Sequence, residues 1–272
     1  MRTALAPNAL SVAQFDRIRE LLYKVSRINL QQGKEKLVEA RLNSRLRDLN
    51  LPDFEAYLGH LEADRAGQEL AVMVDALTTN KTSFFREPAH FEYLRQQVLP
   101  ELRQQRRPIR FWCAGCSTGE EPFSLALLLR RELPEIERLD LAILATDISQ
   151  RVLETARSAT YGQDRLEGLT PQMLQRYGTP VPGGGHQFSA PIRGLVHFAR
   201  LNLMEPWPMK GPFDAIFCRN VMIYFDVPTR QELVRRYTEL LRPGGHLFIG
   251  HSESITGYPH APRYVQPALY QK

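Results

Sequence analysis

The segment of this 272-residue chain with the most chemical potential is residues 113–122, CAGCSTGEEP. Its small residues let the backbone approach a ligand closely, and free amides at a helix start usually favour anions. Glu120 and Glu121 would repel a pyrophosphate there, so the turn suits a nucleoside ligand without phosphates, such as S-adenosylmethionine. The alternative is that both glutamates only stabilise the helix start, a common arrangement.

Asp147 is the second candidate, because it follows the apolar run 141–145. An acidic residue at the end of the second strand holds the ribose hydroxyls in nucleoside-binding α/β folds. The alternative role is to cap the helix expected at 149–157, which Ser149 could also do. Together with the glycine turn, Asp147 favours a nucleoside-binding site.

Residues 213–226, FDAIFCRNVMIYFD, place Arg219 and Asn220 directly after another apolar run. An enzyme that methylates amino groups often has Asn-Pro-Pro-aromatic at this place, and this chain does not, so a different nucleophile is expected. Residues 241–245, LRPGG, are a helix stop before an apolar run, which is frequent in methyltransferase sheets but is also ordinary turn chemistry.

Two other chemistries fit the sequence poorly. Cys113 and Cys116 have the spacing of a redox or metal pair, but only Cys218 remains as a further thiol, and Cys113 falls inside an apolar run. Residues 250–254, GHSES, lack the second glycine of a nucleophile elbow. The three cysteines also give no basis for a disulfide framework.

The elements that would position these residues alternate from about residue 88 onward. Helical stretches such as 122–133 and 231–241 separate the apolar runs, which are 109–113, 141–145, 196–203, 213–218 and 246–250. This alternation predicts a doubly wound, mostly parallel sheet, which binds ligands beyond the carboxyl ends of its strands. Residues 178–194, with five glycines and three prolines, interrupt it as a loop and hairpin excursion.

Residues 11–85 are predicted to be helical. Ser11 and Gln14 form a capping-box pattern ahead of apolar residues at helical spacing. A second helix carries Val38, Leu42 and Leu46, and shorter helices are expected at 54–61 and 70–77. These helices predict a small all-α domain.

Bulk composition is that of an ordinary folded protein, with 43% hydrophobic and 24% charged residues. No apolar run in the first thirty residues reaches the length of a signal or membrane segment, so a cytoplasmic location is expected. Nine basic and four acidic residues lie between Arg17 and Asp48, and this segment carries the whole net charge of +5. It is either a solvated helix face or a docking surface for an acidic partner.

Four motifs, in this order, make the chain resemble the CheR family of bacterial chemoreceptor methyltransferases. They are residues 76–87, ALTTNKTSFFRE; 117–122, STGEEP; 213–226, quoted above; and 250–253, GHSE. The resemblance covers nearly the whole sequence. It implies transfer of methyl from S-adenosylmethionine to receptor glutamates, which gives γ-glutamyl methyl esters and makes the chain a protein-glutamate O-methyltransferase of chemotaxis adaptation.

The resemblance implies an α/β fold: a Rossmann-like class I methyltransferase domain with a small antiparallel β-subdomain, preceded by a small all-α N-terminal domain. The expected ranges are 1–78 for the helical domain, 79–90 for an interdomain segment that contributes to the cofactor site, and 91–272 for the methyltransferase domain. The β-subdomain is expected at 178–200. In some members it grips a C-terminal peptide tether of the receptor, but the excursion is shorter here than in those members, which makes tether binding doubtful.

Carried over by position, the resemblance implies cofactor contacts from nine residues: Asn80, Thr82, Arg86, Glu121, Asp147, Asn202, Leu203, Asn220 and Val221. Arg219 and Tyr224 fall where the family has residues beside the transferred methyl. We expect Arg86 or Arg219 to steer the incoming carboxylate and Tyr224 to shape the methyl-transfer position. No metal is expected.

The resemblance also suggests a partner for the basic segment between Arg17 and Asp48, namely the receptor. Receptor signalling regions are acidic helical bundles, and Lys34, Arg41 and Arg45 fall on one side of a helix, so they are predicted to dock the methylation helix. Three alternatives remain. They are the same chemistry on a receptor-like sensor outside chemotaxis, a regulator that binds S-adenosylmethionine without catalysis, and a nucleic-acid methyltransferase. The last lacks any nucleic-acid-binding motif.

Overall fold

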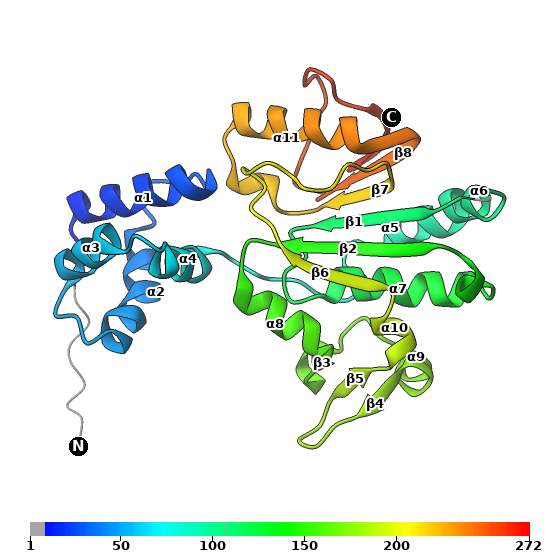
Figure 1. The fold of residues 1–272 in the computed structure, drawn as a ribbon, viewed down its shortest axis with the longest axis horizontal. Coiled ribbons are helices and arrows are strands. Elements are labelled where there is room, and N and C mark those ends of the chain that lie inside the picture. The colour runs from blue at the N-terminus through cyan, green and yellow to red at the C-terminus, as the bar shows by residue number, and fades with distance from the viewer. Residues whose placement is uncertain (1–8, 106) are drawn as a thin grey trace. The chain divides into compact units, whose positions relative to one another are not determined.

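The structure is a computed structural model that describes residues 9–105 and 107–272 (Figure 1). Residues 1–8, the start of the predicted 1–78 domain, lie outside the described residues. Contacts divide the chain into two compact units. The first runs to Thr79 and includes Tyr224–Asp226, and the second comprises Asn80–Ile223 and Val227–Lys272.

The first unit is helical, as predicted. Its helices are α1 (Val12–Ser26), α2 (Glu35–Asp48), α3 (Phe54–Ala63) and α4 (Gln68–Leu77). Both hydrogen bonds of the predicted capping box at Ser11 and Gln14 are formed. The apolar positions that set the helical spacing, such as Leu22, Val38 and Leu42, are fully buried. Their burial is the main stabilising contribution to a unit of short helices.

The segment Tyr224–Asp226 belongs to this helical unit although it follows Asn80–Ile223 in the chain. Tyr23 Oη donates to Asp226 Oδ2 at 2.6 Å, and the Asn29 amide donates to the Tyr224 carbonyl at 2.7 Å. These contacts join residues about two hundred positions apart, so no local pattern in the sequence predicts them.

The second unit is built on a seven-stranded sheet with the order β6-β2-β1-β7-β8-β10-β9. Its strands are β1 (Ile109–Ala114), β2 (Leu141–Asp147), β6 (Val196–Arg200), β7 (Phe213–Cys218), β8 (Leu241–Ile249), β9 (Arg263–Gln266) and β10 (Leu269–Gln271). The first five pair in parallel, and β10 and β9 pair antiparallel. The mostly parallel sheet is therefore confirmed, and β9 and β10 were not predicted.

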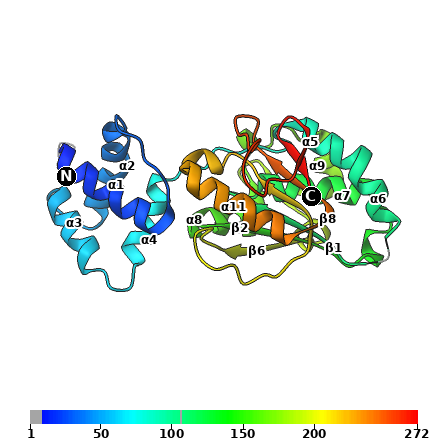
Figure 2. The same cartoon turned by 90° about the horizontal axis from the view of Figure 1, so that it is seen from above.

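Helices cover both faces of this sheet (Figure 2). They are α5 (Pro88–Tyr93), α6 (Leu99–Arg103), α7 (Glu120–Glu132), α8 (Gln150–Ser158) and α11 (Val227–Leu240), with a π-helical turn, η1 (Leu94–Val98), between the first two. Phe111 joins the core cluster that includes α7, whereas its neighbour Trp112 packs edge-to-face on Tyr237 of α11. This alternation is why the central strands are apolar throughout.

A separate three-stranded antiparallel sheet has the order β3-β5-β4. It consists of β3 (Thr160–Tyr161), β4 (Gly178–Pro180) and β5 (His186–Phe188), flanked by α9 (Pro171–Tyr177) and α10 (Ala190–Arg193). Short 3-10 turns complete the unit: η2 (Ile136–Arg138), η3 (Gln163–Arg165) and η4 (Met222–Tyr224). The predicted hairpin is present, but the range 178–200 was wrong at both ends. It omits β3, and it includes β6, which belongs to the large sheet.

None of the helices in residues 9–105 and 107–272 combines the length and apolar character that crossing a membrane requires.

Candidate functional site

Five parallel strands end at one edge of the large sheet, and candidate residues follow each of them. These are residues 115–119 after β1, Asp147 at the end of β2, Asn202 and Leu203 after β6, residues 219–221 after β7, and residues 250–253 after β8. The chain runs outward from β1 in both directions, so the switch point lies between β1 and β7. Ligands of doubly wound sheets bind at such a point.

The turns after β1 and β7 meet at this switch point. Gly115 has a φ of +86°, and a Cβ at this position would lie 2.4 Å from Cγ2 of Val221. Only glycine allows this backbone conformation and this approach together. The first turn is thus held directly against the second.

The backbone amides of the turn after β1 already have acceptors. Gly115 N and Cys116 N both donate to the Thr146 carbonyl, at 2.8 and 2.9 Å, and Ser117 N donates to Asp147 Oδ2 at 2.8 Å. A phosphate site needs amides that point at the ligand. The turn therefore does not offer these three amides to a phosphate, in agreement with the prediction made from its glutamates.

Asp147 organises the end of β2. It is 9% exposed, and its Oδ1 accepts from Ser149 N at 3.0 Å while Oδ2 accepts from Ser117 N. Ser149 caps α8, because its side chain accepts from Val152 N. Asp147 therefore does not provide the helix cap, and its carboxylate lies at the carboxyl end of β2, where nucleoside-binding folds hold the ribose hydroxyls.

Asn202 and Leu203 lie in a turn that is held by one cationic side chain and one aromatic side chain. The Leu203 carbonyl accepts from Arg236 Nη1 at 2.6 Å and from Trp207 Nε1 at 3.2 Å. The Arg236 guanidinium stacks 3.7 Å from the centre of the Trp207 ring. Asn202 Oδ1 accepts from Met204 N at 3.1 Å. The turn is rigidly positioned by residues for which the sequence analysis gave no role.

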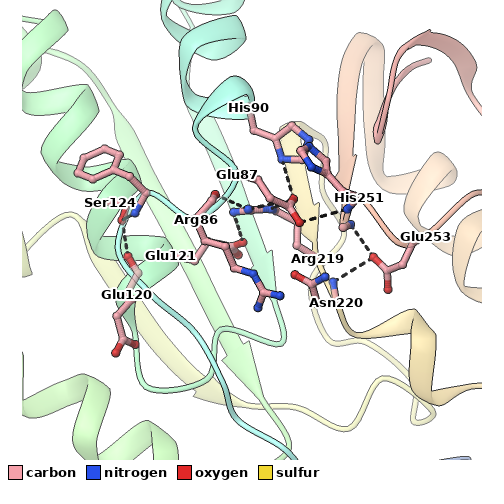
Figure 3. A network of polar contacts seen from close by, with 12 residues as sticks. Arg86, Glu87, His90, Glu120, Glu121, Ser124, Arg219, Asn220, His251 and Glu253 are labelled. Atoms are coloured by element: carbon pink, nitrogen blue, oxygen red, sulfur yellow. Dashed lines mark hydrogen bonds and ion pairs between the residues drawn. The ribbon is translucent and has the colours of Figure 1, made fainter. Parts of the chain in front are cut away.

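Arg219 lies at the centre of a buried network (Figure 3). Its side chain is 2% exposed. Nη1 donates to Glu121 Oε2 at 3.1 Å, Nε and Nη2 donate to Glu87 Oε2 at 3.3 and 3.1 Å, and Nη2 also donates to the Arg86 carbonyl. This one side chain joins α5, α7 and the turn after β7. Its guanidinium is occupied by two carboxylates, which favours a positioning role over direct contact with an acceptor carboxylate.

The pKa values of Glu121 and Glu87 shift in opposite directions within this network. Burial raises the pKa of Glu121, against the opposing charge of Arg219. Burial also acts on Glu87, but Arg219 and the His251 amide outweigh it and lower the pKa of Glu87. His90, beside them, is fully buried, and desolvation together with Arg219 lowers its pKa to about 3. His90 is therefore a neutral packing group near neutral pH.

Asn220 is fixed by Glu253. It has a φ of +59°, and its amide donates to Glu253 Oε2 at 3.0 Å; Gly250 N donates to the same oxygen (Figure 3). A Cβ on Gly250 would lie 2.4 Å from Asn220 Nδ2, so the side chain rests on the Gly250 backbone. Among the described residues, the buried Asn220 Oδ1 has no donor. A buried acceptor left open in this way suits a donor on a ligand.

The segment from Asn80 to Glu87 is fastened to the turn after β1 and to α7. Ser117 Oγ donates to the Asn80 carbonyl at 3.0 Å, and Phe85 N donates to Ser124 Oγ at 2.8 Å. Arg86 Nη1 donates to the Lys81 carbonyl at 3.0 Å, and no dashed line in Figure 3 joins its guanidinium to the other residues drawn. Thr82 is partly buried. The structure thus brings Asn80 and Arg86 to the same strand-end region as Glu121 and Asp147.

Two of the three predicted docking residues have structural partners in the helical unit. Arg41 Nη1 donates to the carbonyls of Leu77 and Thr78, at 2.8 and 2.9 Å, at the C-terminus of α4. Arg45 forms a two-point ion pair with Glu69, which is only 7% exposed. The prediction that Arg41 and Arg45 dock a methylation helix stays a prediction, and both side chains also donate to acceptors in the same unit. Lys34 is exposed.

Tyr224 groups with the helical unit, where its hydroxyl lies 3.5 Å from the Thr79 carbonyl. Its predicted place beside the transferred methyl stays a prediction.

The remaining reactive groups show structural rather than catalytic surroundings. Cys113, Cys116 and Cys218 are free and buried, and burial raises the pKa of each thiol, which disfavours a reactive thiolate. Within the described ranges, one group could offer three metal ligands, Glu87 with His90 and His251. The Arg219 guanidinium already lies on the Glu87 carboxylate and would repel a cation there.

Sequence reasoning missed several residues that build this site. Glu87 stood inside a quoted motif without a role, and Glu253 likewise, although both are paired with backbone or Arg219. No local sequence pattern marks Arg236 or Arg165 as part of the site. Each donates a hydrogen bond to a segment that is distant in the sequence.

The assembled edge presents carboxylate and amide oxygens, and the backbone amides of Gly115, Cys116 and Ser117 are already bonded within the protein. S-adenosylmethionine carries ribose hydroxyls, an adenine amine and an ammonium group, all of which are donors, and it has no phosphate. The residues present therefore fit this cofactor.

Comparison with known proteins agrees with this geometry. Residues 13–78 match the family described as the CheR methyltransferase all-alpha domain, and residues 80–268 match the CheR methyltransferase SAM binding domain, where SAM is S-adenosylmethionine. The chain is 42% identical over 260 residues to chemotaxis protein methyltransferase 2 of Pseudomonas aeruginosa, covering 94% of this chain and 91% of the relative. It is 44% identical over 252 residues to the chemotaxis protein methyltransferase of Escherichia coli, covering 91% and 86%. The chain belongs to the CheR methyltransferase family.

Proposed function

We propose that this protein transfers methyl from S-adenosylmethionine to glutamate side chains of methyl-accepting chemoreceptors in chemotaxis and so forms γ-methyl esters. The family membership and the naming of its relatives as chemotaxis protein methyltransferases support the pathway. The single observation that carries the chemistry is the strand-end edge, which is lined by acceptors and where the amides of residues 115–117 are already bonded within the protein.

Nine residues are proposed to hold the cofactor: Asn80, Thr82, Arg86, Glu121, Asp147, Asn202, Leu203, Asn220 and Val221. When bound, the cofactor supplies an electrophilic methyl group on a sulfonium ion. Asp147 is proposed to accept from the ribose hydroxyls, and the open Oδ1 of Asn220 to accept from a further donor. Val221 packs on Gly115 and keeps the two turns in register.

The acceptor glutamate requires little activation. Its carboxylate is ionised at neutral pH, so an oxygen can attack the methyl carbon without a general base. The protein then has to align the two groups and exclude water. We propose Arg86 as the residue that steers the carboxylate, because within residues 9–105 and 107–272 its guanidinium has one partner, the Lys81 carbonyl, and no carboxylate. Arg219 is proposed to hold Glu87, Glu121 and the Arg86 backbone in place.

Receptor docking is proposed to depend on Lys34 among the three residues first selected. Arg41 and Arg45 are given a smaller part in docking, because they also hold the C-terminus of α4 and Glu69. The three-stranded sheet is not proposed to bind a receptor tether, since its excursion is short. Titration with a receptor C-terminal pentapeptide tests this, and measurable binding heat would contradict it.

The proposed function is tested by labelled-methyl transfer to a helical receptor fragment that carries the acceptor glutamates. The expected label is released as methanol at high pH, because esters hydrolyse there and N-methyl groups do not. Replacement of the acceptor glutamates by glutamine in the fragment should abolish incorporation. Base-stable label, or label that persists in the glutamine fragment, would contradict a glutamyl ester. The variant Tyr224→Phe, assayed at saturating cofactor, tests whether the Tyr224 hydroxyl contributes to transfer.

A further inference from the structure

We propose that Arg165 and Tyr161 are positioning residues for the cofactor turn, so that the small three-stranded sheet is part of the S-adenosylmethionine site. This inference rests on the proposed function for the identity of the ligand. It assigns a role to two side chains that lie outside the strand-end motifs.

Arg165 reaches the turn after β1 from η3. Its Nη2 donates to Thr118 Oγ1 and to Glu120 Oε1, and Thr118 Oγ1 donates to Glu120 Oε2 at 2.8 Å. Glu120 is 1% exposed, whereas the Arg165 side chain is 34% exposed. A carboxylate this deeply buried needs its cation, so removal of Arg165 leaves Glu120 uncompensated inside the turn.

Tyr161 holds the same turn from β3. Its hydroxyl donates to the Thr118 carbonyl at 2.8 Å. Gly119 has a φ of +97°, and a Cβ there would lie 2.8 Å from Tyr161 Oη and 3.0 Å from Cβ of Ala156. The Arg165 guanidinium lies 5.4 Å from the centre of the Tyr161 ring, so the two contacts on the turn form one cluster.

The same cluster also holds the segment that carries Arg86. Phe84 packs edge-to-face on Tyr161 and Phe188, with ring centres 5.0 and 5.6 Å apart. A Cβ on Gly168, where φ is +91°, would lie 2.5 Å from the Phe84 carbonyl oxygen. Both cofactor-bearing segments, residues 80–87 and 115–121, therefore rest on the small sheet.

Glu120 and Glu121, at the start of α7, pair with different arginines. Successive helix positions are about 100° apart, so neighbouring side chains point in different directions. Glu121 contacts Arg219, whereas Glu120 contacts Arg165 (Figure 3 shows the two carboxylates apart). The helix start is thus fixed from two sides, and the Arg165 side is the one that the known motifs do not include.

The test is calorimetric titration of S-adenosylhomocysteine into the full chain and its Arg165→Gln, Arg165→Lys and Tyr161→Phe variants. We expect Arg165→Gln to raise Kd about tenfold, or about 1.4 kcal/mol, with Arg165→Lys in between and Tyr161→Phe about threefold. Arg176→Gln is the matched control, because Arg176 is exposed in the same region and contacts only the Tyr177 ring among the interactions described. Its Kd should equal that of the wild type.

Thermal unfolding of each variant separates positioning from loss of fold. A positioning role predicts a raised KM for S-adenosylmethionine with kcat changed less than about twofold at saturation, in variants that unfold cooperatively. A Kd within twofold of wild type in folded Arg165→Gln would overturn the inference. If Arg165→Gln does not fold, the same result in Arg165→Lys and Tyr161→Phe overturns it. Failure of the wild type to bind S-adenosylhomocysteine would instead contradict the proposed function.

Discussion

The two units each contain a buried ion cluster centred on an arginine, but the clusters join different things. In the helical unit Arg45 pairs with Glu69, whose Oε1 also accepts from the Tyr57 hydroxyl at 2.9 Å. This cluster ties α2, α3 and α4 together and contains no candidate for the cofactor. In the larger unit Arg219 joins Glu87, Glu121 and the Arg86 backbone, which are neighbours of the proposed cofactor site or members of it.

Burial alone therefore does not identify a functional arginine. Both side chains are largely removed from solvent and both hold carboxylates. What distinguishes them is the set of segments that they fix. Loss of the Arg45 cluster should affect the fold only, whereas loss of the Arg219 cluster should affect the fold and the ligand together.

The largest effect is expected for Arg219→Met. This change leaves Glu87 and Glu121 buried without their cation, and breaking such a pair costs about 3–5 kcal/mol. We expect S-adenosylhomocysteine affinity to fall at least about 100-fold, or about 2.7 kcal/mol, as the two segments separate. Calorimetry and urea unfolding measure the two losses. Wild-type affinity in a destabilised Arg219→Met protein would show that the cluster is structural only.

The next effect is expected for Arg45→Met in the helical unit. Glu69 would lose its partner, and the free energy of unfolding should fall by about 3 kcal/mol. Affinity for S-adenosylhomocysteine in the folded protein should stay unchanged. Arg47→Met is the matched control, because Arg47 is exposed on the same helix, and it should change stability by less than about 0.5 kcal/mol. An equal loss of affinity in both Arg219→Met and Arg45→Met would erase the distinction between the clusters.

A smaller effect concerns pH and a histidine outside both clusters. His246 is 3% exposed, and burial lowers its pKa to about 4 from an ordinary value of 6.5. Below pH 6.5 the unfolded chain binds a proton that the folded chain rejects, so this contribution to stability is complete above 6.5 and is lost as the pH falls toward 4. The loss at about pH 5 should be about 2 kcal/mol.

Urea unfolding at about pH 7.5 and about pH 5 checks this in the wild type and in His246→Gln. The variant should lose less stability between the two pH values than the wild type does. His197→Gln, at an exposed position, should keep the wild-type pH dependence. Parallel pH profiles for the wild type and His246→Gln would contradict a buried neutral imidazole.

The smallest effect is expected for Lys34→Glu on the helical unit. Lys34 is exposed, so its reversal should leave stability and cofactor affinity unchanged. Receptor methylation at low acceptor concentration should fall about threefold at low salt and recover toward wild type at high salt. Lys210→Glu, also exposed, is the charge-matched control. An equal decrease in both variants would reflect net charge rather than a docking surface.

Local patterns predicted most of the fold. The capping box at Ser11, the apolar runs of the parallel strands and the helical spacing in α1 to α4 act over a few residues, and each appears as expected. The strands β9 and β10 were not predicted, because they are short and are stabilised by pairing with β8 rather than by their own sequence. The place of β3 in the small sheet was missed for the same reason.

The sequence predicted where the site residues lie in the fold, but not which residues they contact. The strand-end rule selected Asp147 and Asn220, and the structure places both at the sheet edge. It could not show that Asp147 holds the Ser117 amide or that Arg41 holds α4, because such contacts join distant segments and depend on tertiary packing. Spacing along a helix therefore indicated on which side of α2 the charges lie, but not which of them have hydrogen-bond partners in the same unit.

The most direct test of this account is calorimetric titration of the wild-type chain with S-adenosylhomocysteine and, in parallel, with ATP. The amides of residues 115–117, in the turn after β1, are already bonded to Thr146 and Asp147, so we expect these amides not to bind a phosphate. We expect one S-adenosylhomocysteine site per chain and no competing heat from ATP. Tight binding of ATP that displaces S-adenosylhomocysteine, or no binding of S-adenosylhomocysteine, would contradict it.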